Sequence, residues 1–138
     1  MTKPVRLQLS RKKGFNLQEL SLATNGLPAV NVARPSIYSN PFQIGKPSGY
    51  LFNDGGDPAP LIPAMSREKC VEFFEQMARG ILSPEMHPWG HRWNERIVSD
   101  RGGFHRLKYD LRARNVACWC GPNDLCHGDV WLRLCEEV

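Results

Sequence analysis

The sequence predicts a small α/β protein in which residues 1–138 form one domain, with a Rossmann-like sheet flanked by helices. Short segments with the alternation or composition of strands are followed by longer segments with helical periodicity, an order typical of a mostly parallel sheet. Near the end of the chain a strand-like segment runs into cysteines and then into a helix, which places reactive side chains at the carboxyl edge of that sheet. A chain of 138 residues has the size of one domain and buries enough surface to form a core.

The first half of the chain predicts two strands and a long loop. Residues 5–9 alternate between apolar and polar side chains, which indicates a strand that ends at the basic turn of residues 11–14. Residues 29–33 are rich in β-branched residues and predict a second strand, which ends at Arg34. Residues 28–63 contain seven prolines and several glycines, so we expect a long Pro/Gly-rich loop there, supplemented at most by further strands of the sheet.

The second half predicts helices around one strand. Ser66 is a suitable N-cap for an amphipathic helix over residues 66–79, whose apolar face includes Cys70 as a core thiol. Gly80 fits the position that ends such a helix. The other expected elements are irregular structure over 83–103, a helix over 104–112, a strand over 115–120, a turn over 121–124 and a closing helix over 125–137.

Charge and composition limit the class of protein. A net charge of +4 and a pI near 8.9 make the chain mildly basic, which fits a nucleotide or nucleic-acid ligand. No stretch is long and apolar enough to cross a bilayer, and residues 1–10 lack the pattern of a signal peptide. We therefore expect a cytoplasmic protein with reduced thiols and no membrane partner. The cysteine count of five is odd, which argues against a disulfide framework.

The most informative segment is a cluster of reactive side chains. It contains Cys118, Cys120, Cys126, His127 and Asp129. Residues two apart in a strand point to the same face, so the first two thiols are expected to lie side by side. The turn that follows brings the start of the next helix back toward the strand end. This arrangement predicts one site built from the last strand and the last helix.

Three interpretations of the cluster remain open. Cys118, Cys120, Cys126 and His127 offer the ligand types of a closed zinc site, although the first pair is separated by one residue and adjacent helical residues point about 100° apart. Alternatively, Cys126 in a first helical turn has a lowered pKa and acts as a nucleophile, with His127 and Asp129 transferring protons. In the third interpretation the cysteines are small core residues and His127 fills the helix start.

Other polar groups suggest an anion or a nucleic acid as ligand. Arg34 follows the second strand and precedes a cluster that includes Asn40, which is typical either of a phosphate pocket or of a solvated turn. His87 and His91 have metal-ligand spacing on a helix, but proline and glycine between them make that helix improbable. Arginines and lysines over residues 92–114 alternate with aromatic residues, which suits a nucleic-acid surface or a solvated helix face.

The chain resembles a family of uncharacterised proteins from bacteria and phages, the domain of unknown function DUF4326. The resemblance spans nearly the whole chain and is carried by residues 4–14, by Arg34-Pro35 with Asn40-Pro41-Phe42, and above all by Ala117-Cys118-Trp119-Cys120 followed by Cys126-His127-Gly128-Asp129-Val130. Ala33 and Gly128 depart from the family, in which glycine and alanine are common. The same ending resembles a second uncharacterised α/β family, which implies that Cys118, Cys126 and His127 belong to a functional site. The phage setting implies nucleotide or nucleic-acid metabolism by analogy.

The leading hypothesis from the sequence is a hydrolase or transferase that acts on a nucleotide, nucleoside or nucleic-acid base. In this hypothesis Arg34 and the start of the last helix bind phosphate, Asn40 and Cys118 contact the substrate, and Cys126 is the nucleophile. The alternative is a zinc-binding module that binds nucleic acid or protein without catalysis. A third hypothesis is a phage effector that binds a host protein.

Overall fold

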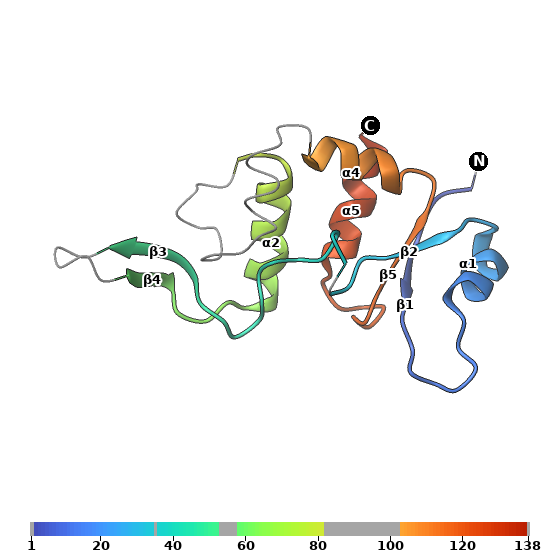
Figure 1. Ribbon diagram of the computed structural model, residues 1–138, viewed down its shortest axis with the longest axis horizontal. Coiled ribbons are helices and arrows are strands. Elements are labelled where there is room, and N and C mark those ends of the chain that lie inside the picture. The colour runs from blue at the N-terminus through green and yellow to red at the C-terminus, as the bar shows by residue number, and fades with distance from the viewer. Residues whose placement is uncertain (1, 35, 53–57, 82–102, 138) are drawn as a thin grey trace. The chain divides into compact units, whose positions relative to one another are not determined.

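The computed structural model describes residues 2–34, 36–52, 58–81 and 103–137. The chain divides into two compact units, one formed by Met1–Ser39 with His105–Val138 and the other by Asn40–Phe104. The first unit contains β1 (Arg6–Gln8), α1 (Leu17–Asn25), β2 (Ala29–Asn31), most of α4 (Gly103–Leu111), β5 (Asn115–Cys118) and α5 (His127–Glu136) (Figure 1). The second unit contains β3 (Ser48–Phe52), β4 (Pro58–Ile62) and α2 (Arg67–Ala78).

A three-stranded parallel sheet forms the centre of the first unit. The strand order is β1-β5-β2, so β5 lies in the middle and pairs with both neighbours. Every residue of β5 is buried, as expected for a central parallel strand that is covered on both faces. Because the strands are parallel, their carboxyl ends meet at one edge of the sheet, and the cysteine cluster begins at that edge.

Helices cover both faces of this sheet. Asn115 on β5 donates a hydrogen bond to Ser21 on α1. The next residue, Val116, faces α5, because its Cγ2 lies 3.4 Å from the place that a Cβ on Gly128 would take. Side chains alternate along a strand, so Cys118 shares the α5 face with Val116. Figure 1 shows α1 and α5 on opposite sides of the strands.

A buried amide network joins the α1 face to the sheet. The side chains of Asn115 and Asn25 exchange two hydrogen bonds, and Asn115 also donates to Ser21 Oγ at 2.8 Å. The Asn115 carboxamide oxygen accepts the backbone N–H of Val5 at 2.9 Å. Asn115 is fully buried, and these partners satisfy its polar atoms, as a buried amide requires.

Removing this amide is expected to destabilise the first unit strongly. Asn115→Leu keeps a similar volume but leaves the buried Ser21, the half-buried Asn25 and the Val5 N–H without their hydrogen bonds to this amide, so we expect a loss of about 2–4 kcal/mol in the free energy of unfolding. Urea denaturation measures it. Asn123→Leu, in an exposed turn, serves as the control and is expected to stay within about 0.5 kcal/mol of the wild type. A loss for Asn115→Leu as small as that of the control would contradict this role.

The apolar face of α5 builds the core on the other side of the sheet. Val130, Trp131 and Leu134 are almost completely buried. Trp131 packs edge-on against Tyr38, with ring centroids 5.8 Å apart, and its indole N–H donates to the Tyr38 carbonyl at 2.9 Å. This arrangement satisfies the polar atom of the largest buried side chain. It holds α5 against the segment that follows β2.

The second unit combines a two-stranded sheet with a capped helix. β3 and β4 pair antiparallel, with Ser48 opposite Ile62. Ser66 is the N-cap of α2 and accepts a hydrogen bond from the Lys69 N–H at 3.1 Å, as predicted. Gly80 follows the helix with a positive φ of 73°, which glycine adopts without strain. The buried side of α2 comprises Cys70, Phe73, Phe74, Met77 and Ala78.

The structure confirms a small mixed α/β fold and corrects several elements. Helix α1 was not predicted, although Asn16 accepts a hydrogen bond from the N–H of Glu19 at its start and Gly26 ends it in the left-handed conformation. The long loop predicted over residues 28–63 contains the strands β3 and β4, but these pair with each other and do not supplement the main sheet, as had been allowed for. The last strand ends at Cys118, two residues earlier than predicted.

Some predictions lie outside the described residues or remain untested. Irregular structure over 83–103, the His87 and His91 pair and the basic residues of 92–101 fall almost entirely within the undescribed segment. The Rossmann-like description and the single domain stay predictions. Within the described part of the chain, no helix has the length and apolar character needed to span a membrane.

Candidate metal centre

The cysteine cluster lies where the parallel strands end. The Cys118 carbonyl accepts the N–H of Leu9, which follows β1, at 2.8 Å. On the other side, the Ala117 carbonyl accepts the N–H of Val32, which follows β2, at 2.9 Å. The chain then leaves the sheet through Trp119, so the sheet itself fixes the position from which the cysteine loop starts.

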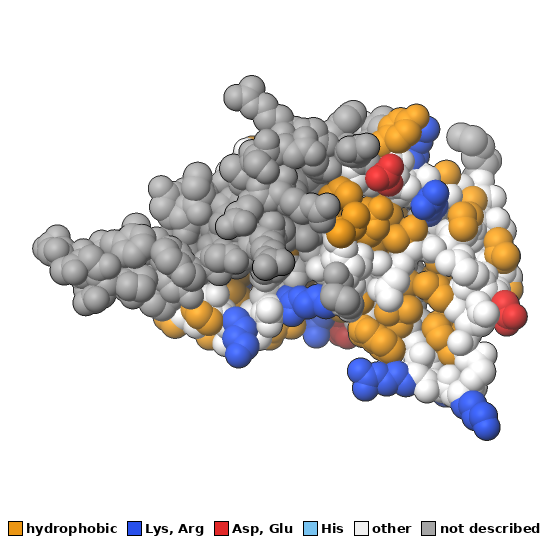
Figure 2. Space-filling view, viewed as in Figure 1, with side chains coloured by type: hydrophobic (Ala, Val, Ile, Leu, Met, Phe, Trp, Pro, Cys, Tyr) orange, Lys and Arg blue, Asp and Glu red, His pale blue; other side chains and the backbone are white. Residues whose placement is uncertain are grey.

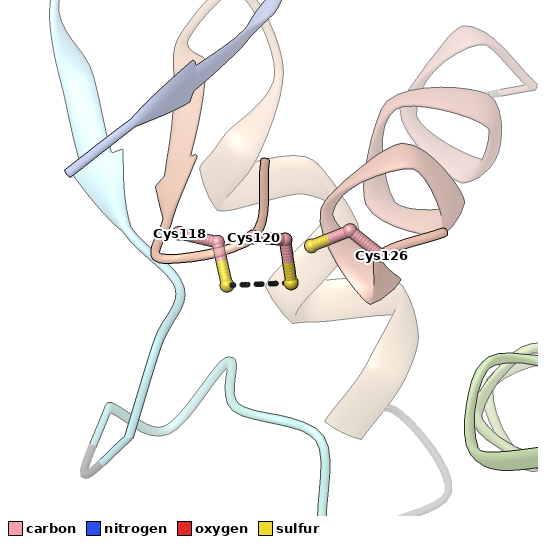
Figure 3. A group of neighbouring side chains, drawn as sticks. All are labelled: Cys118, Cys120 and Cys126. Atoms are coloured by element: carbon pink, nitrogen blue, oxygen red, sulfur yellow. Dashed lines mark hydrogen bonds between the residues drawn. The ribbon is translucent and has the colours of Figure 1, made fainter. Parts of the chain in front are cut away.

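Three thiols converge at this point. The sulfur atoms of Cys118, Cys120 and Cys126 all lie within 4.8 Å of one another. Figure 3 shows them coming from the end of β5, the loop after it and the start of α5. The Cys118 and Cys120 sulfurs are 3.8 Å apart. Tetrahedral zinc with Zn–S bonds near 2.3 Å places its sulfur ligands about 3.8 Å apart, so this pair already has the spacing of a zinc site.

The backbone explains why Cys126 and His127 lie close together. Cys126 is not in the helix but is its N-cap, with an extended backbone of φ −148° and ψ 144°. Its sulfur accepts the N–H of Gly128 at 3.4 Å and lies 3.9 Å from Nδ1 of His127. The expectation that both residues sit in a regular first turn, and therefore diverge, is wrong. An extended N-cap removes that objection to their acting together.

The hydrogen bond of His127 defines which ring nitrogen carries the proton. Nε2 lies 2.8 Å from the Val32 carbonyl, and a carbonyl only accepts, so Nε2 carries the proton. Burial lowers the pKa of His127, and the charges of Arg34 and Arg6 lower it further, so the ring is neutral at pH 7. Nδ1 therefore presents a lone pair beside Cys126. Histidines that bind metals commonly donate their other N–H to a carbonyl in this way.

Two thiols of the cluster, Cys118 and Cys126, retain their protons more strongly than a free cysteine does. Hydrogen bonds to the thiols of Cys118 and Cys120, and then burial, raise the pKa of Cys126. The hydrogen bond to Cys120 likewise raises the pKa of Cys118. This direction is opposite to the lowered pKa expected of a nucleophilic Cys126, whose catalytic role stays a prediction. A divalent cation reverses this balance, because it binds thiolates and displaces their protons.

Arg6 on β1 holds the loop that carries Cys120. Its guanidinium group donates to the Cys120 carbonyl at 3.3 Å and to the Gly121 carbonyl at 3.1 Å. It also donates to the carbonyls of Pro122 and Asp124 and forms an ion pair with Asp129 at 3.0 Å. The Arg6 side chain is 8% exposed. One buried arginine thus ties β1, the cysteine loop and the first turn of α5 together.

A model of the domain of unknown function DUF4326 matches residues 15–137. The chain belongs to this family. No curated protein and no solved structure matches it. The match covers the second unit and, except for residues 1–14 and 138, the first unit of the DUF4326 chain, and it includes every cysteine of the cluster.

The structure of this DUF4326 domain separates the other predicted site residues. The Asp129 carboxylate forms an ion pair with Arg6, and its backbone N–H donates to the Cys126 carbonyl at 3.1 Å. The proton-transfer role predicted for Asp129 stays a prediction. Arg34 is exposed after β2, and its charge acts on His127, while its predicted phosphate contact stays a prediction. Asn40 belongs to the second unit, where its amide donates to Cys70 and accepts from Phe42. That role is to hold a loop.

Sequence reasoning missed the supporting groups of the DUF4326 site. In the sequence Arg6 is a polar position of an alternating strand. Its neighbours in the sequence do not indicate that it donates hydrogen bonds to carbonyls more than a hundred residues away. The Val32 carbonyl carries no sequence signal at all. The sequence did indicate that Cys118 and Cys120 lie together, because they are two residues apart. Their sulfur atoms are 3.8 Å apart, while Trp119 between them is 46% exposed.

Cys135 provides an internal comparison for the clustered thiols. It lies on α5 away from the cluster, and its thiol donates to the Lys108 carbonyl at 3.4 Å. Burial raises the pKa of Cys135 to about 11. We therefore expect its alkylation by iodoacetamide to be slow at pH 8 and to accelerate only as the pH approaches 11, because the thiolate is the reacting form. Peptide mass spectrometry measures the rate, and the unfolded chain is the control. Fast alkylation of folded Cys135 at pH 8 would contradict this.

Proposed function

We propose that this DUF4326 protein is a zinc-binding module in which a Cys₃His centre fixes the carboxyl edge of the sheet. Cys118, Cys120 and Cys126 bind the ion as thiolates. His127 supplies the fourth ligand through Nδ1. The observation that carries the proposal is the set of sulfurs within 4.8 Å of one another, held by three separately anchored pieces of backbone.

The ligand chemistry supports zinc. Thiolate and imidazole are the donors of closed structural zinc sites. Nδ1 of His127 is 3.9 Å from the Cys126 sulfur, against about 3.6 Å for a nitrogen and a sulfur on the same tetrahedral zinc. The group of ligand atoms that lie within 4.8 Å of one another contains the three sulfur atoms but no nitrogen of His127. Zinc binding would therefore bring the His127 ring closer to the sulfur atoms. The ion would then connect β5 to α5. Because His127 bonds to the Val32 carbonyl, the ion would also be connected to the segment directly after β2.

A thiolate enzyme is the weaker candidate. It requires an ionised Cys126 and a nearby acid or base, whereas the neighbouring thiols raise the pKa of Cys126 and Asp129 pairs with Arg6. A closed zinc site uses the same groups without a free nucleophile.

Metal analysis of the purified protein tests the proposal. Expression in zinc-supplemented medium, followed by exhaustive dialysis and elemental analysis, should give about one zinc per chain. His127→Ala should retain zinc but release it to a chelator at least tenfold faster, because three thiolates remain. Protein that contains no zinc after reconstitution under reducing conditions would overturn the proposal. Zinc retention in His127→Ala with unchanged release would remove His127 from the ligand set.

A further inference from the structure

A basic and aromatic surface lies beside the cysteine loop. Trp119 lies between Cys118 and Cys120, directly after the end of β5, and it is 46% exposed. The guanidinium carbon of Arg11 lies 5.0 Å from the centre of its ring. Arg11 follows β1, whose end is bonded to the end of β5 through the Leu9 N–H. The sheet therefore fixes the tryptophan and the arginine next to each other.

The turn after β1 adds positive charge to this surface. Arg11, Lys12 and Lys13 are consecutive and exposed. Among the described residues none of them forms an ion pair with a carboxylate. Gly14 closes the turn with a φ of 86°, and the Phe15 N–H bonds back to the Lys12 carbonyl at 3.1 Å. Figure 2 shows lysine and arginine side chains projecting at the lower edge of the view, over the connection between β1 and α1.

We propose that this surface binds single-stranded nucleic acid. Trp119 offers a stacking platform for one unpaired base, and Arg11, Lys12 and Lys13 contact the phosphates on either side of it. An exposed tryptophan beside unpaired cations is the combination that binds single strands with little sequence preference. Paired bases in a duplex do not present their faces to a protein side chain, so the tryptophan favours single strands. The inference does not depend on the zinc ion.

A second arginine–aromatic pair serves as the comparison within the same chain. Arg112 lies 4.3 Å from the ring centre of Tyr109 on α4, and Tyr109 is 54% exposed. Asp110 follows this tyrosine directly, and tyrosine has the smaller ring system. No acidic residue lies within residues 10–16 around Arg11. The Trp119 surface is thus the better fit to a polyanion.

Fluorescence anisotropy with labelled 20-nucleotide single strands of DNA and of RNA tests the inference on the full chain. We expect binding at low salt, tighter than to the corresponding duplex. The logarithm of the association constant should fall with the logarithm of salt concentration with a slope of about −2, which corresponds to three phosphate contacts. Tighter binding to RNA than to DNA would indicate an additional contact to the 2′-hydroxyl. Equal binding would indicate that the protein contacts the phosphates and bases that RNA and DNA share.

Point variants locate the surface. Trp119→Ala should weaken binding roughly tenfold or more, and Trp119→Phe should restore most of it. Lys12→Gln should reduce the magnitude of the salt slope by about 0.7, whereas Lys46→Gln, an exposed lysine of the second unit, should not. Urea denaturation of each variant controls for folding. Absence of binding, stronger duplex binding, or loss of binding in Tyr109→Ala but not in the Trp119 and Lys12 variants would overturn the inference.

Discussion

Replacing any one of Cys118, Cys120 and Cys126 by serine is expected to abolish stable zinc binding and to lower the free energy of unfolding by about 4 kcal/mol or more. A hydroxyl is a poor zinc ligand, and the binding free energy of a structural zinc ion contributes directly to folding. The ion links the end of β5 to the start of α5, which are joined along the chain by the loop of residues 119–125. Its loss therefore frees the loop and the helix start together.

Chemical denaturation of each variant, with and without added chelator, measures this effect. Cys135→Ser is the matched control, since Cys135 lies on α5 and is not one of the three clustered cysteines. It should change stability by less than about 1 kcal/mol, and chelator should still destabilise it. Two results would contradict the zinc proposal. One is a stability of the cluster variants equal to that of Cys135→Ser, and the other is a wild-type stability that chelator does not change.

Replacing Arg6 is expected to cause the second large effect. Arg6→Met keeps much of the side-chain length but leaves the Cys120, Gly121, Pro122 and Asp124 carbonyls and the Asp129 carboxylate without their donor. We expect a loss of about 2–4 kcal/mol in stability, and zinc affinity about 10- to 100-fold lower because the Cys120 loop is no longer held in place. Arg6→Lys should recover only part of both, since one ammonium group cannot replace a planar fork of donors.

The matched control for Arg6 is Lys3, which also pairs with an acid of α5. Lys3 and Glu136 are 2.8 Å apart, but both side chains are more than half exposed. Exposed ion pairs contribute little, so Lys3→Met should be almost neutral. Stability by denaturation and zinc affinity by chelator competition distinguish the two. Equal effects of Arg6→Met and Lys3→Met would show that the carbonyl contacts do not organise the loop.

The elements that the sequence predicted well are those whose signals are local. The cap and apolar face of α2 follow from Ser66 and the spacing of its apolar residues. The alternation of Cys118, Trp119 and Cys120 predicts which side chains face the site. These features depend on neighbours within one or two turns of the chain. The start of helix α1 also carries a local signal, in Asn16 and Glu19.

Other features depend on contacts between distant segments and had no local signal. The polar residue Asn115 starts a buried strand because Asn25 and Ser21 on α1 satisfy its amide. Arg6 is buried because backbone carbonyls more than a hundred residues away accept its N–H groups. A pairing of β3 with β4 in a proline-rich segment likewise depends on the register between two strands, which composition does not indicate.

X-ray absorption at the zinc edge of the reconstituted protein tests the central claim most directly. The account predicts three sulfur ligands near 2.3 Å and one imidazole nitrogen at about 2.0–2.1 Å. The nitrogen contribution should disappear in His127→Ala, while the three sulfur ligands remain. A spectrum dominated by oxygen and nitrogen ligands, with at most one sulfur, would contradict it.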